Sequence, residues 1–229
     1  MQLTPEQLKT NYDSLIAIIE ENIESPRKEQ LIELYDSMAE HMIMAPASGV
    51  KHFHLAFAGG YCIHVRNVVN ASLLVAKTFK QLGGTIDFTK EELVFSALNH
   101  DLGKVGDGVD PYYVPEESEY YRKRYDRTYT RNKDITNMDV TNRALFLLQK
   151  AGIVVTENEF LAIYNSDGMF DEKNHYYLKN WDESKKPRTF LLEILHWGDA
   201  MACKAEYSGW KYDNLTNIDP PKEKKSQTK

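Results

Sequence analysis

Helix-start signals recur along this chain, and apolar residues at helical spacing follow each of them. Thr4, Thr89 and Thr156 each stand three residues before a Gln or a Glu. This is the pattern of a capping box, in which the two side chains satisfy free backbone N–H groups at the start of a helix. Apolar residues then recur three or four positions apart, and no segment shows the alternation of a strand. The chain is therefore predicted to be all-α.

Proline and glycine divide this pattern into successive segments, and no linker separates them into two domains. We expect residues 1–212 to form one helical domain, and the polar, lysine-rich residues 213–229 to form a flexible tail. The predicted helices run from caps or prolines to the next glycine, proline or polar break: 5–21, 26–45, 61–82, 90–101, one that ends at 151, 157–164 and 187–212. The helix that ends at 151 starts after either Asp139 or Thr141 as its cap.

Residues 105–136 interrupt the helical pattern. Glycines and prolines rule out a long helix, and six of the 14 tyrosines fall between Tyr112 and Tyr129. Basic residues are interleaved with these tyrosines: Arg122, Lys123, Arg124, Arg127, Arg131 and Lys133. An irregular segment of this length is usually functional or disordered, and many tyrosines argue against disorder. We expect a lid-like insertion, with an interaction surface or oligomer contact as an equally weighted alternative.

The composition excludes several classes of protein. The formal net charge of −6 disfavours binding to nucleic acid or acidic membranes. Cys62 and Cys203 are the two cysteines and form no CxxC pair, so neither a disulfide framework nor a thiolate zinc site is expected. The N-terminus lacks the features of a signal peptide, and no apolar stretch reaches about 18 residues. A cytoplasmic protein with no membrane association is expected.

His100 and Asp101 are adjacent at the end of one predicted helix. Burying both groups costs free energy unless each has a partner. A divalent metal would pair with both, because imidazole nitrogen and carboxylate oxygen are good metal ligands. The structural alternative is a helix end that carries His and Asp before Gly103, and the dipeptide does not exclude it.

Two other predicted helices carry compatible groups. His64 lies near the start of one, and Asp199 lies on the otherwise apolar last helix. Each has a simpler explanation by itself, as a core histidine or as half of an ion pair. One mononuclear site formed by His64, His100, Asp101 and Asp199, with open positions for water and substrate, explains all of them together.

The order His64, His100-Asp101, Asp199 on successive helices resembles the HD superfamily of metal-dependent phosphohydrolases. The segments Phe53-His54…Gly59-Gly60…His64 and Asn99-His100-Asp101-Leu102-Gly103-Lys104 also resemble a form of the motif found in several of its branches. The resemblance covers about residues 50–208, so the helices within 1–46 lie outside the motif core. It implies an all-α fold in which these four residues hold a divalent ion: Mn, Fe, Co, Ni, Zn or Mg.

Members with two metals carry additional histidines between the His-Asp pair and the last Asp. Here that interval contains only His175 and His196, so one metal is expected. A bound metal lowers the pKa of its water and polarises a phosphoryl oxygen. Asp101, Lys104 and Asp167 are the expected catalytic residues, with Lys104 neutralising phosphoryl charge and Asp167 acting as acid, base or water-orienting group.

The insertion would then contribute to substrate binding. Arginine binds phosphate bidentately, and tyrosine stacks on a base. The expected substrate-binding residues are Lys104, Tyr121, Arg122, Arg124, Arg127 and Arg131.

These inferences predict a hydrolase that removes phosphate from a small nucleotide or deoxynucleotide. Two alternatives remain: a phosphodiesterase acting on RNA or DNA 3′ ends or on cyclic nucleotides, and a catalytically idle HD scaffold that binds a nucleotide. The charge of −6 argues against a stable nucleic-acid partner. The presence of all four ligands argues against the scaffold. Homo-oligomer formation is left open.

Overall fold

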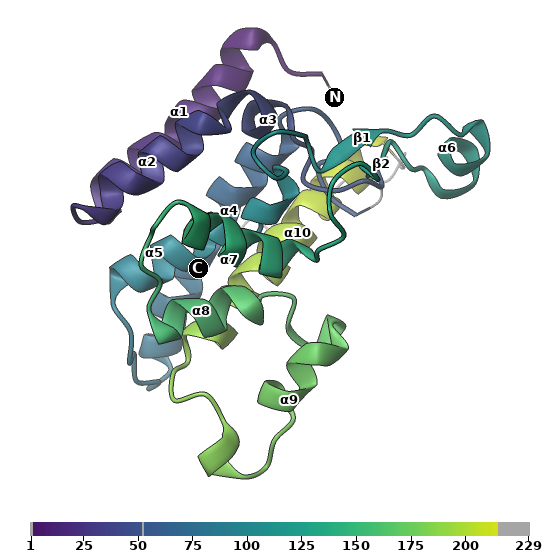
Figure 1. Cartoon of the computed structure of the whole chain (residues 1–229). Helices are drawn as coiled ribbons and strands as arrows, with labels where there is room; N and C mark the ends of the chain where they lie inside the picture. The colour runs from purple at the N-terminus through teal and green to yellow at the C-terminus, as the bar shows by residue number, and fades with distance from the viewer. Residues whose placement is uncertain (1, 52, 215–229) are drawn as a thin grey trace, which may run out of the picture.

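The computed structural model describes residues 2–51 and 53–214, and most of these residues are helical (Figure 1). The α-helices are α1 (Pro5–Asn22), α2 (Arg27–Ser37), α3 (Ala39–Met44), α4 (Gly60–Gln81), α5 (Lys90–Asn99), α6 (Glu119–Tyr125), α7 (Val140–Lys150), α8 (Glu157–Tyr164), α9 (His175–Leu178) and α10 (Leu191–Asn214). Short 3-10 helices are η1 (Leu102–Lys104), η2 (Gly168–Phe170), η3 (Glu172–Asn174) and η4 (Glu183–Lys185). The predicted all-α class is confirmed. The predicted tail lies outside the described residues from residue 215 onward.

The helix starts that depend on local side chains are those that the sequence predicts. All three capping boxes form, pairing Thr4 with Gln7, Thr89 with Glu92 and Thr156 with Glu159. Of the two caps considered for α7, Asp139 is the one used, and its carboxylate accepts a hydrogen bond from the backbone of Asn142.

Two predicted helix boundaries are wrong. The helix expected over 26–45 is interrupted at Met38, whose φ of −117° and ψ of 12° end α2 and start α3. The last helix begins at Leu191 rather than at Pro187. The carboxylate of Asp87, which lies between α4 and α5, accepts a hydrogen bond from the backbone N–H of Phe190 at 3.1 Å. A contact between distant segments therefore fixes where α10 starts.

The insertion is not irregular throughout, which corrects the prediction. Strands β1 (Tyr113–Pro115) and β2 (Tyr129–Arg131) pair antiparallel, with Val114 opposite Thr130, and α6 lies between them. We call residues 112–132 the arm. It projects from the helical body, with α6 at its far end (Figure 1). Three-residue strands are too short to show alternation in a sequence, so they could not be recognised there.

Helices α4 and α10 pack closely along each other, and a glycine permits this approach. A Cβ atom added at Gly198 on α10 would lie 2.2 Å from the Oγ of Ser72 and 2.8 Å from its Cα, on α4. Helix α5 also packs against α4. His64 on α4 and Asp199 next to Gly198 are therefore brought to the same part of the core.

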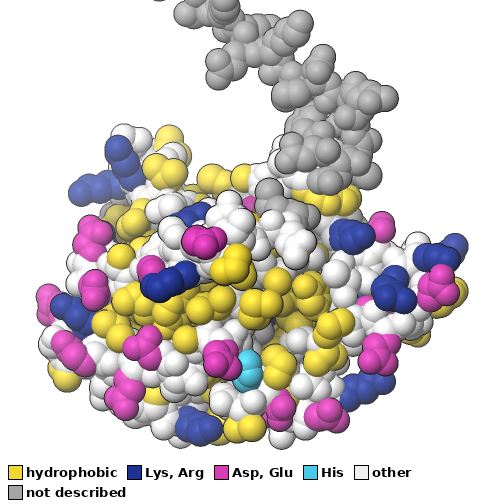
Figure 2. All heavy atoms as spheres, turned by 90° about the horizontal axis from the view of Figure 1, so that it is seen from above, with side chains coloured by type: hydrophobic (Ala, Val, Ile, Leu, Met, Phe, Trp, Pro, Cys, Tyr) yellow, Lys and Arg dark blue, Asp and Glu magenta, His cyan; other side chains and the backbone are white. Residues whose placement is uncertain are grey.

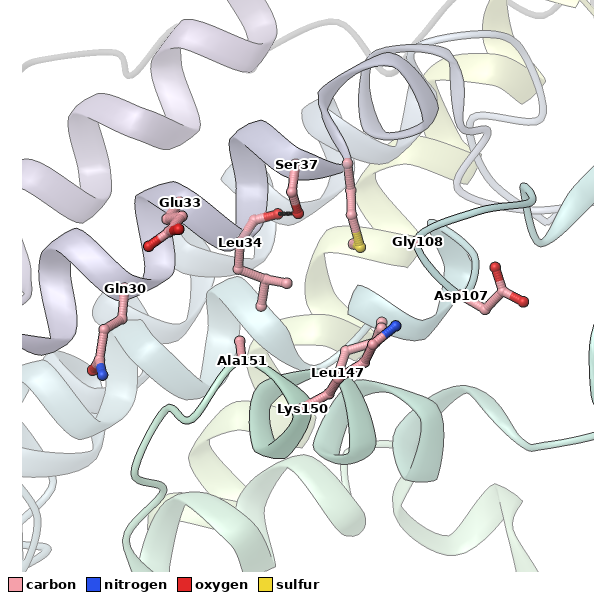
Figure 3. Close-up of a pocket in the computed structure, with 10 residues that line it drawn as sticks. Gln30, Glu33, Leu34, Ser37, Asp107, Gly108, Leu147, Lys150 and Ala151 are labelled. Atoms are coloured by element: carbon pink, nitrogen blue, oxygen red, sulfur yellow. Dashed lines mark hydrogen bonds between the residues drawn. The ribbon is translucent and has the colours of Figure 1, made fainter.

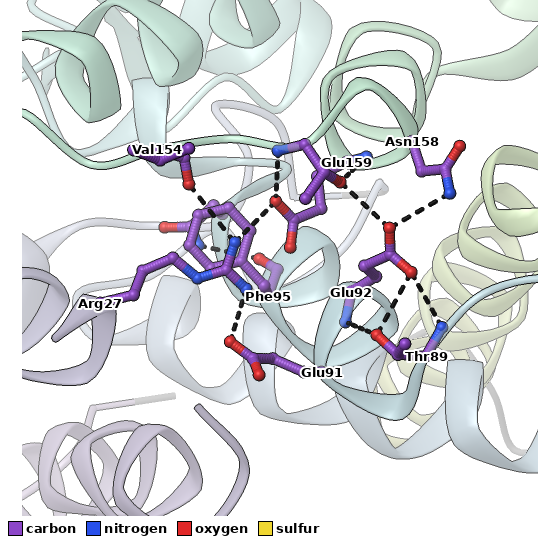
Figure 4. A network of polar contacts seen from close by, with 10 residues as sticks. Arg27, Thr89, Glu91, Glu92, Phe95, Val154, Asn158 and Glu159 are labelled. Atoms are coloured by element: carbon purple, nitrogen blue, oxygen red, sulfur yellow. Dashed lines mark hydrogen bonds and ion pairs between the residues drawn. The ribbon is translucent and has the colours of Figure 1, made fainter. Parts of the chain in front are cut away.

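A cluster of charged side chains, the Arg27 cluster, joins the start of α2 to α5 and α8 (Figure 4). The Arg27 guanidinium contacts Glu159 at 2.8 Å and Glu91 at 2.6 Å, and donates to the carbonyl of Val154. It also lies 4.2 Å from the centre of the Phe95 ring. The Glu159 side chain is 0% exposed, so its charge depends on this arginine.

The surface seen from above carries charged side chains of both signs, with apolar side chains between them (Figure 2). No extended field of one sign covers that face. None of the helices in the described part of the chain has the length and apolar character needed to cross a membrane.

Candidate metal centre

The four residues predicted as metal ligands lie together where α4, the end of α5 and α10 meet. His64 Nε2 is 3.5 Å from Asp101 Oδ2 and 3.3 Å from Asp199 Oδ1. His100 Nε2 is 3.5 Å from Asp101 Oδ2 and 3.9 Å from Asp199 Oδ1. Ligand atoms about 2.1 Å from one ion are about 3.0–3.4 Å apart when they occupy adjacent positions. Three of the four distances are longer than this range. The potential ligand atoms of His64, His100 and Asp101 lie within 4.8 Å of one another, so these three residues could hold one ion, and Asp199 lies beside them.

Both imidazoles are held so that Nε2 faces the carboxylates. His100 Nδ1 lies 2.8 Å from the carbonyl oxygen of Ala97, which only accepts, so Nδ1–H is the donor. His64 Nδ1 lies 3.1 Å from Glu206 Oε2, and Asn67 donates to the same carboxylate at 2.9 Å. A carboxylate or carbonyl behind the ring is the usual arrangement around a metal-binding histidine.

The Nε2 atom of His100 is buried and has no hydrogen-bond partner among the described residues. Its side chain is 2% exposed. With Nδ1–H donated to Ala97, the neutral imidazole carries its lone pair on Nε2, which faces oxygens of Asp101 and Asp199. Two buried lone pairs that face each other repel, and an unpaired buried acceptor costs about 1–3 kcal/mol. A cation between them would satisfy both.

Carboxylates outnumber lysines at the candidate centre. Asp101, Asp199 and Glu206 surround the imidazoles, while Lys104 contacts Asp101 Oδ2 at 2.5 Å. Burial alone would raise the pKa of Asp101, but the charge of Lys104, the nearby His100 and a hydrogen bond with His64 hold it well below its usual value. Burial likewise opposes the ionisation of Asp199, and its hydrogen bond with His64 outweighs this and lowers its pKa. Both predicted carboxylate ligands are therefore ionised.

Burial lowers the pKa of His64, and hydrogen bonds to Asp101, Asp199 and Glu206 outweigh this and raise it well above its usual value. The carboxylates thus draw positive charge to His64 Nε2. A bound metal would supply that charge in place of a proton, because a ligating imidazole must give up the proton on its ligating nitrogen.

Three residues that the sequence did not mark as ligands border the centre. They are Glu206, described above, and His54 and Cys203. The His54 ring lies 4.7 Å from that of His64, and its Nε2 is buried without a partner. Burial, with repulsion from His64 and Lys104, lowers the pKa of His54 to about 3, so it is neutral. Cys203 Sγ lies 3.4 Å from Asp199 Oδ1. Potential ligand atoms of His54, His64 and Cys203 lie within 4.8 Å of one another.

The sequence contains a signal for two of these residues, Cys203 and Glu206. Cys203 and Glu206 follow Asp199 by four and seven positions, which places all three on one face of α10. His54 lies in the connection between α3 and α4, where no periodicity marks a side chain as buried.

Asp167 lies in the turn after α8; part of the residue is exposed, and protein atoms surround its carboxyl group. Burial of its carboxyl group raises its pKa, and the negative charges of Asp101 and Asp199 add to this while Lys104 opposes it. It therefore lies close enough to the centre to interact electrostatically with two ligands.

Three of the predicted substrate-binding residues lie on α6 at the far end of the arm (Figure 1). Tyr121, Arg122 and Arg124 are exposed on α6 at the end of the arm. Arg127 lies 3.8 Å from the carboxylate of Glu116 and over the Tyr121 ring. Arg131 donates to Asn137 and to the carbonyl of Ile135, which holds the following loop. Of the predicted substrate-binding residues, Lys104 is the one for which the described structure gives a contact with a ligand.

Comparisons with known proteins do not identify a function for the centre, so its interpretation depends on the geometry described above. No protein-family model, curated protein or solved structure matches the chain. The resemblance to the HD superfamily thus remains a prediction from the ordered His, His-Asp and Asp residues.

Proposed function

We propose that this protein is a metal-dependent phosphohydrolase of the HD type that acts on a small phosphate ester, a nucleotide or deoxynucleotide. His64, His100, Asp101 and Asp199 would hold one divalent ion. The observation that carries the proposal is His100 Nε2, buried without a partner and facing carboxylate oxygens on two segments. Side chains of the described chain leave this atom unsatisfied, and a metal ion would satisfy it.

The donor set narrows the class of metal. Two carboxylates accept all the divalent ions considered, Mn, Fe, Co, Ni, Zn and Mg. Two imidazoles favour the transition metals over Mg²⁺, which prefers oxygen ligands.

When bound, such an ion lowers the pKa of a coordinated water and polarises a phosphoryl oxygen. The side chains around it have separate roles. Lys104 Nζ has three N–H donors and donates one hydrogen bond to Asp101, so the other two are available to phosphoryl oxygens. Glu206 and the carbonyl of Ala97 hold the two imidazoles in place. Asp167, with its raised pKa, is suited to hold and release a proton.

A phosphodiesterase would use the same centre on a nucleic-acid end or a cyclic nucleotide. The exposed Tyr121, Arg122 and Arg124 at the end of the arm favour it, because stacking and cationic side chains bind single strands. The net charge of −6 and the mixed charges of the face in Figure 2 favour the small ester. An idle nucleotide-binding scaffold is the third outcome of the test.

The test is phosphate release by metal-stripped protein reloaded with each ion in turn, on nucleoside mono- and triphosphates, cyclic nucleotides and a short single strand. We expect metal-dependent release from one class of small nucleotide. His100→Ala should abolish both metal content and release, whereas His175→Ala, a histidine outside the centre, should abolish neither. Cleavage confined to the strand or the cyclic compounds would establish the phosphodiesterase. Binding without cleavage under every metal would establish the scaffold.

A further inference from the structure

A cavity of about 460 Å³ lies against Lys104, between α3 and the base of the arm. Its volume is within the range of small-molecule sites, about 300–1,000 Å³. The described residues that line it include Lys104 but none of the four proposed metal ligands. Lys104 also contacts Asp101 at 2.5 Å, so it joins the cavity to the metal centre. A molecule in this cavity would have one end next to Lys104.

The walls are mainly apolar and aromatic. Tyr113 on β1 and Tyr129 on β2 face the cavity together with Met44 of α3. Tyr129 is opposite Pro115 in the sheet, so the two tyrosines are diagonal neighbours on paired strands. Aromatic rings and a methionine form a surface that suits a flat ring.

The base of the arm is fixed against the body, so these walls are set before any ligand arrives. The carbonyl of Gly49 accepts hydrogen bonds from the backbone N–H groups of Thr128 and Tyr129, at 2.9 and 3.1 Å. A Cβ atom at Gly49 would lie 2.7 Å from the carbonyl oxygen of Tyr129 and 3.4 Å from the Tyr113 ring. A preformed cavity binds without the cost of ordering its walls.

The charges on the walls limit the number of phosphates. Lys104 is the one lysine or arginine in the described lining, and the other ionisable groups besides the tyrosines are Glu40 and His41 of α3. One cation beside a metal centre suits a single phosphate. A triphosphate would bring further negative charges, for which the described lining has no other lysine or arginine and one more carboxylate, that of Glu40.

We propose that this cavity binds the base and sugar of a nucleoside monophosphate, with the flat ring between Tyr113, Tyr129 and Met44 and the phosphate at Lys104. This inference rests on the proposed function, since the metal centre is what would act on the phosphate. It deepens that function by naming the substrate class as a monoester rather than a triphosphate. It also assigns specificity to residues of α3 and the arm.

The test fills the cavity from two sides. Met44→Trp starts from a side chain that is 53% exposed, and Ala58→Trp starts from the connection before α4. The matched control is Ala151→Trp, in a different hollow of about 330 Å³ between α2 and α7 (Figure 3). Gln30, Asp107 and Lys150 line that hollow, and none of the proposed ligands is among its described lining residues.

Two measurements apply to each variant. The first is the ratio of kcat/KM for a nucleoside monophosphate to that for glycerol phosphate, which has no ring. The second is saturation-transfer NMR of a free nucleoside with the metal-stripped protein, which needs no turnover. We expect Met44→Trp and Ala58→Trp to lower the ratio at least tenfold and to abolish the transfer. Ala151→Trp should change neither, and the wild type should prefer the monophosphate to the triphosphate at least tenfold.

The outcomes separate this inference from the proposed function. If the wild type hydrolyses nucleotides but both cavity variants keep the ratio and the transfer, the cavity inference is overturned and the function stands. If no ester is hydrolysed but the nucleoside binds and Met44→Trp abolishes its binding, the cavity inference stands and the function fails. A preference for the triphosphate would overturn the choice of a monoester.

Discussion

The Arg27 cluster and the metal centre both hold charged side chains between helices, but their acidic side chains are paired differently. In the Arg27 cluster, Glu91 and Glu159 both contact the guanidinium directly. In the metal centre, Lys104 contacts Asp101, while Asp199 is left to His64 and Cys203. The first cluster is completed by its own side chains. The second instead gathers His and Asp ligand atoms around one position with Lys104 on one side of it, an arrangement that suits a metal ion better than a structural ion pair does.

The largest effect that would test this contrast is the loss of a ligand. Asp199→Ala should abolish stoichiometric metal binding and lower kcat/KM at least 10³-fold, about 4 kcal/mol. The free energy of unfolding of the metal-stripped protein should change by about 1 kcal/mol or less, because one of three neighbouring carboxylates is removed. Metal content after dialysis and urea unfolding check the two parts. Full metal content in this variant would refute the centre.

Arg27→Met should have the opposite effects: it should lower the free energy of unfolding and leave metal binding unchanged. Removing the guanidinium leaves Glu159 buried without its cation, which costs about 3–5 kcal/mol of unfolding free energy. Metal content per folded molecule should not change. Urea unfolding of this variant beside Lys28→Met, its neighbour on α2, measures the effect. Adding Glu159→Leu to Arg27→Met should recover part of the loss, and no recovery would show that the cost has another origin.

A smaller effect is expected from the carboxylate behind His64. Glu206→Gln keeps the size of the side chain but weakens its hold on His64 Nδ1, so metal affinity should fall by about 10–100-fold. Competition with a chelator measures the affinity. Glu193→Gln, earlier on α10, is the control and should leave it unchanged. An equal loss of metal affinity in both variants would show that Glu206 has no specific role at the centre.

The smallest effect concerns Glu92, which lies beside the Arg27 cluster (Figure 4). Burial opposes its ionisation, but hydrogen bonds from the Thr89 backbone and from Thr156 and Asn158 outweigh this and lower its pKa below 4.5. Its stabilising contribution is therefore present above pH 4.5 and is lost as the pH falls through the lowered pKa. Glu92→Gln should cost about 1 kcal/mol at pH 7. The difference, measured by urea unfolding, should shrink as the pH falls below 4.5, and a difference that stays constant would contradict the assignment.

The sequence predicted those features that neighbouring residues determine. The capping boxes at Thr4, Thr89 and Thr156 involve residues three positions apart, so they could be recognised without the fold. The start of α10 could not, because Asp87 contacts Phe190 from more than a hundred residues away. Tertiary contacts of this kind have no local signal in a sequence.

The candidate site was predictable to the extent that its ligands are unusual for their surroundings. His64, the His100-Asp101 pair and Asp199 interrupt apolar helical patterns, which marks them as needing partners. The exposed arginines of the arm carry no comparable signal, because a sequence does not say toward which side an arm turns. Their expected role at the substrate is untested, and the structure places Arg122 and Arg124 at the end of the arm.

The position of Asp199 on α10 has a consequence for how the protein would acquire a metal ion. His64, His100 and Asp101 are made before Asp199, since synthesis proceeds from the N-terminus. The donor set is incomplete until α10 has left the ribosome and docked at Gly198 against Ser72. A nascent chain would thus offer only a partial set of ligands to the metals of the cell. The metal that the protein retains would then depend on the packing of α4 against α10 in the folded chain, and not on which metal the nascent chain met first.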